Sequence, residues 1–411
     1  MKFPNPRLAS LVALSAFITP FDVSAANSNF QDFFFQACSN PVAGLAARCG
    51  ETNGGLGDLS GDSESSLNPS QNLSTSSGNL SSARSRNEQA REHGDQVRGY
   101  STSDGDRISI GPFSLLLNGR YAQQKVDRDT DLERSFDLDV YGAQLGLDKR
   151  ITDALVAGVW LHWGSSDLEY ASEVPGRNFE PMGSAGEVNG DSLGASIFLS
   201  SSFAGGGYLD VSLGYMAHEF DIERRALFQE SNRVVTTTRV VTEASTDSDE
   251  WWGVANVGYN INRGSLSFAP YASIAFSNNK TDGYLEEDLS GSGLAMAVDD
   301  SELDSTSAAV GFLASISIST SSFVLLPQLR VEYVRQLDRA APEAGVSFIN
   351  DSAASQFLLQ GERVDSDRVD LSVGASAIFP NGLIGFVDVQ GSFAVRDVER
   401  YSVSVGIRRE F

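Results

Sequence analysis

Apolar and polar residues alternate with a period of two along most of the chain from about residue 108 onward. In each segment one row is apolar or aromatic and the other is small or polar, a pattern typical of β-strands with two unlike faces. The pattern predicts twelve strands, at 113–121, 141–148, 155–163, 193–200, 209–215, 252–261, 266–276, 307–318, 323–333, 369–379, 383–393 and 401–411.

The links between these segments differ in length on the two sides. Five links are tight-turn sequences, "RITD", "AGGG", "NRG", "STS" and "PNG". On the other side lie the longer polar links 127–134, 171–187, 226–249, 285–305 and 339–368, and the short link 396–399. Short turns on one rim and long loops on the other are typical of outer-membrane barrels, with the turns in the periplasm. On this topology Phe411 falls at the periplasmic rim.

Charged residues gather on the row opposite the apolar one. A dry sandwich core would exclude unpaired charges, whereas a hydrated lumen accepts them at little cost. We therefore predict an all-β fold over residues 106–411, a closed twelve-stranded antiparallel transmembrane barrel, rather than a soluble sandwich. The predicted lumen-lining residues are Arg120, Asp148, His162, Asp210, Arg330, Glu332, Asp370 and Asp388.

Composition narrows the functional class. Apolar residues make up 41% of the chain, and no window approaches the roughly 20 continuous apolar residues of a membrane helix. The 54 acidic and 30 basic residues give a net charge of −24, which argues against a nucleic acid partner. A membrane barrel remains compatible with both values, because its strands bury only every second residue in lipid.

The N-terminus predicts export. Lys2 and Arg7 precede an apolar run, and small residues near Ala25 offer a cleavage site, so residues 1–25 are expected to form a signal peptide. In an oxidising compartment the two cysteines, Cys38 and Cys49, are candidates for a disulfide. Residues 51–82 are rich in Gly, Ser and Asn, so the segment 26–82 is expected to be a short, largely disordered passenger or linker.

Residues 83–97 have a different character. Ser82 can cap a helix, the residues that follow are good helix formers, and Gly94 can end it. This helix has almost no apolar face, so it belongs in water or in a polar cavity. Residues 83–105 are therefore predicted to hold a pore helix and its link to the barrel.

Four stretches carry a family resemblance. "YGAQLGLDKRITDALVAGVWLHW", "SFAPYASIAFSNNKTDGYLEED", "LLPQLRVEYVRQ" and the ending "YSVSVGIRREF" together resemble the C-terminal translocator domain of bacterial autotransporters. The resemblance implies type V secretion: a barrel in the outer membrane of a Gram-negative bacterium, threaded by the upstream helix, that carries a passenger to the cell surface. It also implies an assembly signal in the last strand, formed by Tyr401, Val403, Val405, Ile407 and Phe411.

The implied partners follow from the same resemblance. They are outer-membrane lipid and lipopolysaccharide, the Sec translocon and the barrel assembly machinery, with the protein as a monomer. The chain departs from the family in its passenger, which has no long repeat and no room for an enzyme. Some members cleave the helix between two asparagines, whereas here Asn87 is followed by Glu88.

Two other functions are weighed against this interpretation. One is a structural or porin-like barrel whose lumen the helix merely plugs. The other is a vestigial esterase, because "GDSLG" around Ser192 spells a nucleophile block. That chemistry needs an activating histidine, and none of His93, His162 and His218 lies in an Asp-x-x-His sequence. We therefore expect no enzyme activity and assign no catalytic, cofactor-binding or metal-binding residue.

Overall fold

The computed structural model describes residues 30–52, 55, 57–59, 61–98, 111–127, 134–172, 182–203, 205–229, 237–338, 341–361, 363, 366–393, 395 and 397–411. The expected signal peptide and residues 99–105 of the expected link lie outside these residues. None of the described helices is long and apolar enough to span a membrane.

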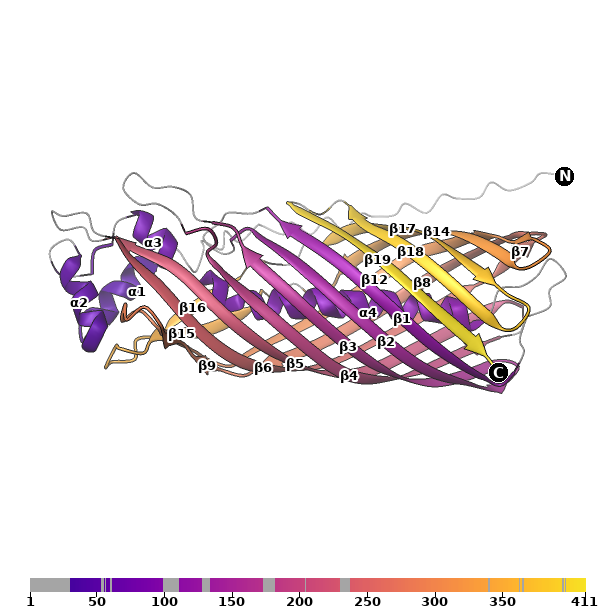
Figure 1. Ribbon diagram of the computed structural model, residues 1–411, viewed down its shortest axis with the longest axis horizontal. Helices are drawn as coiled ribbons and strands as arrows, with labels where there is room; N and C mark the ends of the chain where they lie inside the picture. Colours follow the sequence, from indigo (N-terminus) through magenta and orange to yellow (C-terminus); the bar gives the residue numbers. More distant parts are fainter. Residues whose placement is uncertain are drawn as a thin grey trace, which may run out of the picture.

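Twelve long strands form a closed antiparallel barrel, as the alternating pattern predicts (Figure 1). Each strand pairs with its neighbours along the chain, and the pairings of β1 with β19 and of β6 with β8 leave no open edge. The strands are β1 (Phe113–Val126), β2 (Phe136–Thr152), β3 (Leu155–Tyr170), β4 (Gly186–Ser202), β5 (Gly207–Gln229), β6 (Thr237–Tyr259), β8 (Leu266–Thr281), β12 (Ser301–Ile316), β14 (Val324–Gln336), β17 (Asp367–Ile378), β18 (Leu383–Phe393) and β19 (Val398–Glu410). Two short strands, β7 (Ile261–Arg263) and β13 (Ile318–Ser319), pair beside the turns.

The last strand closes the barrel against the first. Phe411 donates its backbone N–H to the carbonyl of Phe113 at 3.0 Å, and Phe113 donates back at 3.2 Å. Their rings stack with centroids 6.2 Å apart. A closed barrel requires its last strand to pair with its first, and these contacts confirm the predicted closure.

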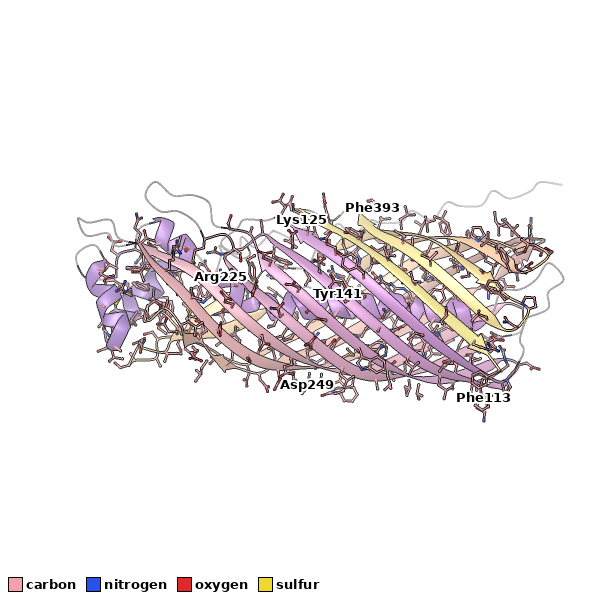
Figure 2. All side chains as sticks on the ribbon, viewed as in Figure 1. Phe113, Lys125, Tyr141, Arg225, Asp249 and Phe393 are labelled. Carbon is pink, nitrogen blue, oxygen red and sulfur yellow. A yellow bond between two sulfur atoms is a disulfide. The ribbon has the colours of Figure 1, made fainter. Side chains whose placement is uncertain are left out.

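The outward row of each strand is apolar over the half of the barrel that carries the short turns. Figure 2 shows the outward side chains, from Phe113 near the C-terminal end to Tyr141 along β2. Leu115, Leu147, Val159 and Ile197 in this region all face out. In a membrane barrel such a band contacts lipid.

The polarity of the two rows reverses beyond this band. On β2, Phe136 and Leu138 point inward while Asp137 points outward, and on β5 Ile222 points inward while Glu223 points outward. The reversal follows from a change of solvent, because above a bilayer the outside of a barrel faces water. The strands β5 and β6 therefore run on as strands through much of the link that the sequence assigned to a loop, 226–249.

A long helix runs through the barrel. Helix α4 (Ser74–Arg98) lies inside the ring of strands (Figure 1) and contacts β2, β3, β4, β5, β6 and β8. It begins at Ser74, earlier than the predicted start at residue 83. Its first turns are rich in poor helix formers, but Thr75, Asn79 and Ser81 are buried in the barrel, and Asn79 donates to the Ser248 hydroxyl at 3.0 Å. Tertiary contacts here outweigh local helix propensity.

The end of the barrel away from the C-terminus carries a second folded layer (Figure 1). A small sheet there has the strand order β16-β15-β11-β9, and β10 (Glu287–Asp288) pairs with β6. The sheet strands are β9 (Tyr284–Leu285), β11 (Met296–Val298), β15 (Glu343–Phe348) and β16 (Phe357–Gln360). We call these four strands the outer sheet.

The described residues of 30–73 form a cap on this layer. The cap contains α1 (Phe30–Ala37), α2 (Ala43–Glu51), α3 (Gly61–Leu67) and the 3₁₀ turn η2 (Ser70–Leu73). For these residues the prediction of a largely disordered segment is wrong. The segment is ordered because of long-range burial: Phe30, Phe33 and Phe34 are buried in one core with side chains of the outer sheet. Each buried phenylalanine contributes roughly 1.5–3 kcal/mol.

Candidate functional site: the filled pore and its cap

The pore is filled by α4 and a layer of polar side chains. All eight predicted lumen-lining residues lie on inward-facing rows, buried or half-buried against the helix or the wall. Four of them contact charged or ionisable side chains of α4, and the other four make polar contacts within the barrel wall. The strand residues that contact the helix are Arg120, Asp148, Arg330 and Glu332. Those that bond within the wall are His162, Asp210, Asp370 and Asp388.

Glu88 is the central helix residue in this layer. Its carboxylate forms a close ion pair with Arg120 of β1 and accepts from Arg400 Nη1 of β19 at 3.2 Å. Gln390 of β18 donates to the same carboxylate at 3.0 Å. Glu88 therefore joins the helix to the strands on both sides of the closure between β1 and β19.

Further ion pairs fix the helix to other parts of the wall. Arg91 Nη2 lies 3.1 Å from Glu332 Oε1 on β14, and His93 Nε2 lies 3.1 Å from Asp148 Oδ2 on β2. Arg86 pairs with Glu250 on β6, and Asp95 pairs with Arg330 on β14. These contacts hold the helix to several strands inside the lumen. The sequence could predict a charged helix beside a charged wall, but not these pairings, because they depend on how the helix is rotated.

The other predicted lumen residues are held within the wall. Gln144 donates to Nδ1 of His162 at 3.0 Å, and His162 Nε2 lies 2.8 Å from the Ser196 hydroxyl. Asp210 accepts from Ser200 at 2.7 Å, and Asp388 accepts from Ser372 at 2.6 Å. Asp370 accepts from Arg368 Nε at 3.0 Å. These groups form a polar lining, and the described residues hold no cluster of side chains suited to a metal ion.

A polar cavity lies between α4 and the wall of β2–β5. Gly142, Gly164 and Gly190 lie on inward rows there, where their missing side chains leave room. The cavity is lined by Ser85, Arg86, Gln89, Gln144, His162, Ser192 and His218, among others.

The cavity brings the serine of the "GDSLG" sequence next to a histidine, although the sequence offers no Asp-x-x-His partner for it. Ser192 of β4 lies directly opposite His218 of β5, and His218 Nε2 is 3.1 Å from Glu250 Oε2. This neighbourhood is missed in the sequence because it depends on strand register. Within the described chain, however, no hydrogen bond joins Ser192 to His218, and Glu250 is already paired with Arg86.

Tyrosines mark the outer edge of the apolar band. Tyr121 donates to Asp139 Oδ1 at 2.6 Å, and its ring lies 5.2 Å from that of Tyr141. Tyr401 donates to Gln123 Oε1 at 2.7 Å, and Tyr215 donates to Asp249. Aromatic residues with one polar end are typical of the membrane–water boundary.

Beyond the tyrosines, outward carboxylates oppose one another across six adjacent strands. Each is the direct cross-strand partner of the next, and like charges placed so are destabilising unless counterions screen them. The row runs Asp137, Glu169, Glu187, Glu223, Glu243 and Glu287, on β2, β3, β4, β5, β6 and β10. Figure 2 places Arg225, the neighbour of Glu223, on the part of β5 near the cap. We call this the carboxylate row.

The outer sheet is fixed to the barrel by a buried ion pair. Arg224 of β5 donates from Nε and Nη2 to the two oxygens of Glu286 at 2.7 and 2.6 Å, and also to the carbonyl of Leu294 at 3.0 Å. Glu286 accepts further from the N–H of Met296 at 2.9 Å. Both charged side chains are almost completely buried.

Asp288 organises the turn next to this pair. Its carboxylate accepts from the N–H groups of Gly293 at 2.6 Å and Ser292 at 3.1 Å, and from the Ser290 hydroxyl at 2.9 Å. Burial alone would raise the pKa of Asp288, but these hydrogen bonds outweigh it and lower the pKa below its usual value. The segment from Asp288 to Gly293 is therefore held in one shape.

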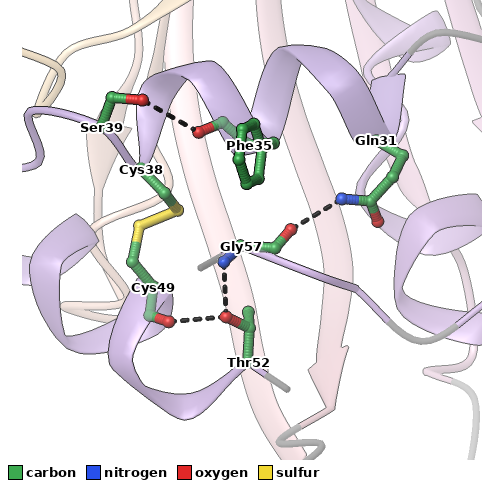
Figure 3. The surroundings of a disulfide bond; sticks show 7 residues. All are labelled: Gln31, Phe35, Cys38, Ser39, Cys49, Thr52 and Gly57. Carbon is green, nitrogen blue, oxygen red and sulfur yellow. Dashed lines mark hydrogen bonds between the residues drawn. A yellow bond between two sulfur atoms is a disulfide. The ribbon is translucent and has the colours of Figure 1, made fainter. Parts of the chain in front are cut away.

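The cap is closed by the Cys38–Cys49 disulfide, which joins the end of α1 to α2 (Figure 3). Thr52 donates to the carbonyl of Cys49 at 2.6 Å and accepts from the N–H of Gly57 at 2.7 Å. Gln31 of α1 donates to the carbonyl of Gly57 at 2.7 Å. The disulfide and these bonds make α1, α2 and the following turn one compact unit.

The predicted assembly-signal residues share one face of the last strand. Tyr401, Val405, Ile407 and Phe411 are exposed on the outward row of β19, and Val403 on the same row is half-buried. They belong to the apolar outer face of the barrel. Their position is that of a lipid-facing row.

Comparison with known proteins identifies the family. The family model described as the autotransporter beta-domain matches residues 116–390, most of the barrel. The chain belongs to the autotransporter β-domain family. This places the barrel in the outer membrane of Gram-negative bacteria.

A solved autotransporter structure shares this fold, and two others are similar to the chain at lower scores. The translocator domain of NalP from Neisseria meningitidis is 15% identical with a TM-score of 0.55, over 79% of this chain and 97% of that one. The β-domain of Bordetella BrkA is 16% identical with a TM-score of 0.47, over 73% and 100% of the two chains. The transport unit of Escherichia coli AIDA-I is 12% identical with a TM-score of 0.43, over 74% and 91%. No curated protein matches the chain.

Proposed function

We propose that this autotransporter carries its own N-terminal segment to the cell surface and holds it there as the folded cap, with α4 as the anchor. One observation carries the proposal. The chain passes from the cap directly through η2 into α4, which then runs down the pore between charged walls. The cap lies at the end with the long links, which in outer-membrane barrels faces the outside.

The proposed activity is transport and anchoring without catalysis. The missing hydrogen bond between Ser192 and His218, within the described chain, supports this view over the esterase alternative. The ion pairs of α4 would suit a plug as well, but a plug alone gives no reason for a disulfide-closed cap whose phenylalanines share a core with the outer sheet and the barrel.

An engineered protease site between Asn53 and Gly54 tests the proposal. The added protease should cut this variant on intact cells as fully as on permeabilised ones. The matched control carries the same site between Asn381 and Gly382, in the short turn between β17 and β18. That control should be cut only after permeabilisation. Protection of the Asn53–Gly54 site on intact cells would contradict surface display.

Export and assembly partners belong to the same proposal. We infer that residues 1–25 direct the chain to the Sec translocon and are removed, and that the outward row of β19 is read by the barrel assembly machinery. The apolar band with its tyrosine edge suits outer-membrane lipid and lipopolysaccharide.

Phe411→Ala should reduce the amount of assembled barrel in the outer membrane several-fold while changing the stability of assembled barrel little. Phe411 is 57% exposed, so its loss removes little burial once the barrel is closed. Gel mobility of unheated samples measures assembly, and thermal unfolding of the purified barrel measures stability. The matched control is Phe393→Ala, because Phe393 is 55% exposed at the far end of β18. Normal assembly of the Phe411 variant would refute a signalling role for this residue.

A further inference from the structure

We propose that the outer sheet, with the adjoining tips of β5 and β6, is a receptor surface for residues 30–52 of the same chain. Docking on this surface would retain residues 30–52 at the cell after the chain is cut between this segment and α3. The inference rests on the proposed display of the cap at the cell surface. Its experiment distinguishes a failure of docking from a failure of surface display.

The first observation is a shared aromatic core. Phe33 of α1 stacks between Phe348 of β15 and Phe357 of β16, with ring centroids 5.2 Å from each. Phe30 meets Phe357 edge-on at 5.7 Å, and Phe34 meets Phe348 edge-on at 5.7 Å. These rings are almost completely buried. If the cap left, the inner face of the outer sheet would expose a contiguous apolar patch, which soluble surfaces avoid.

The second observation is backbone recognition beside that core. Pro41, between α1 and α2, forms an isolated antiparallel bridge with Asp351. Val42 donates its N–H to the carbonyl of Asn350 at 2.9 Å, and the Ser352 hydroxyl donates to the carbonyl of Asn40 at 2.8 Å. Main-chain hydrogen bonds of this kind fix the register of a docked segment, so the contact is specific and does not depend on hydrophobic burial alone.

The third observation is a close backbone approach on α2. A Cβ atom placed on Gly44 would lie 2.6 Å from the Cα of Gly293, and one placed on Gly293 would lie 2.2 Å from the carbonyl carbon of Gly44. Only two glycines allow this contact. Asp288 holds the turn that carries Gly293, so hydrogen bonds within the receptor surface itself fix the backbone that Gly44 contacts.

The receptor is also anchored independently of the cap. Arg224 and Glu286 tie the outer sheet to β5 by hydrogen bonds that involve no cap residue. On the other side Arg48 of α2 donates to Thr238 of β6, and its guanidinium lies over the Phe228 ring of β5 at 5.6 Å. The cap therefore contacts a surface built from distant parts of the barrel, and the disulfide keeps both docking helices together.

The experiment uses the full chain with the protease site between Asn53 and Gly54. After digestion on intact cells, the N-terminal fragment is followed in the cell pellet and in the medium. We expect most of the fragment to stay with the cells. Phe33→Ser in the same background should increase its release at least about ten-fold, because loss of a buried phenylalanine is worth more than a tenfold change in an equilibrium. Phe35→Ser is the matched control, since Phe35 on the same helix is 50% exposed.

Phe348→Ser tests the receptor side and should release the fragment as Phe33→Ser does, while gel mobility shows that the barrel is assembled. Release of the fragment from the otherwise unaltered protein overturns the inference and leaves surface display standing. Equal retention by the Phe33 and Phe35 variants also overturns it. A site that is cut only after permeabilisation would instead refute surface display itself.

Discussion

Replacing Glu88 with alanine should loosen α4 in the pore and raise the ion conductance of the reconstituted barrel severalfold. The change removes the carboxylate that both Arg120 and Arg400 contact, and it leaves Arg120 with Glu92 at 3.4 Å. Removing one partner of a buried ion pair costs about 3–5 kcal/mol. Gln390 loses its acceptor as well. The helix should therefore leave its place or fluctuate in it, and current across planar bilayers measures the result.

The neighbouring residue provides the control for this prediction. Asn87 is half-buried on the same turn of α4, and its side-chain oxygen accepts no hydrogen bond from the part of the chain that the structure describes. Asn87→Ala should leave the conductance low. An assembled Glu88→Ala barrel that conducts no better than the Asn87 variant would show that the helix is held by shape and not by this charge.

Replacing Arg224 with leucine should destabilise the outer sheet and the cap together. The substitution leaves the Glu286 carboxylate buried beside Leu294 and Met296 without its cation, at a cost of about 3–5 kcal/mol. The barrel below should keep its fold, because its strands pair independently of this contact. Amide hydrogen exchange of β9, β11 and α1 measures the local effect against that of β1 and β19.

The adjacent arginine gives a matched comparison. Arg225 faces outward and pairs with Glu223, but both side chains are partly in water. Such a pair is worth about 0–1 kcal/mol, so Arg225→Leu should change exchange in the outer sheet little. Equal effects of the two substitutions would mean that the buried pair does not hold the sheet.

The sequence predicts the barrel well because lipid and a wet lumen impose opposite demands on alternate residues. For that reason β2 can be recognised from its outward residues Tyr141, Leu145 and Leu147. All twelve predicted segments fall on the observed strands. The predicted strands stop where the rule reverses. Past Tyr215 on β5 the inward residues Phe220 and Ile222 are apolar and the outward ones are acidic, so a search for apolar residues facing outward ends too early.

The cap and its receptor could not be predicted in the same way. The Cys38–Cys49 pair was found because the chain has only two cysteines, yet nothing near Phe33 in the sequence indicates Phe348 or Phe357. Their contact joins segments roughly three hundred residues apart. For α4, composition revealed the charged stretch around Glu88 but missed the turns that begin at Ser74, which only the barrel wall stabilises.

The carboxylate row has a consequence for how copies of the protein share a membrane. It gives one side of the protruding barrel a mainly negative wall, from Asp137 on β2 to Glu287 on β10, in which Arg225 is paired with Glu223. Two such walls repel each other over about 8 Å at physiological ionic strength, and less as salt rises. Barrels that turn these sides to one another are thus held apart, and any crowding of the protein in the membrane must proceed through its other side.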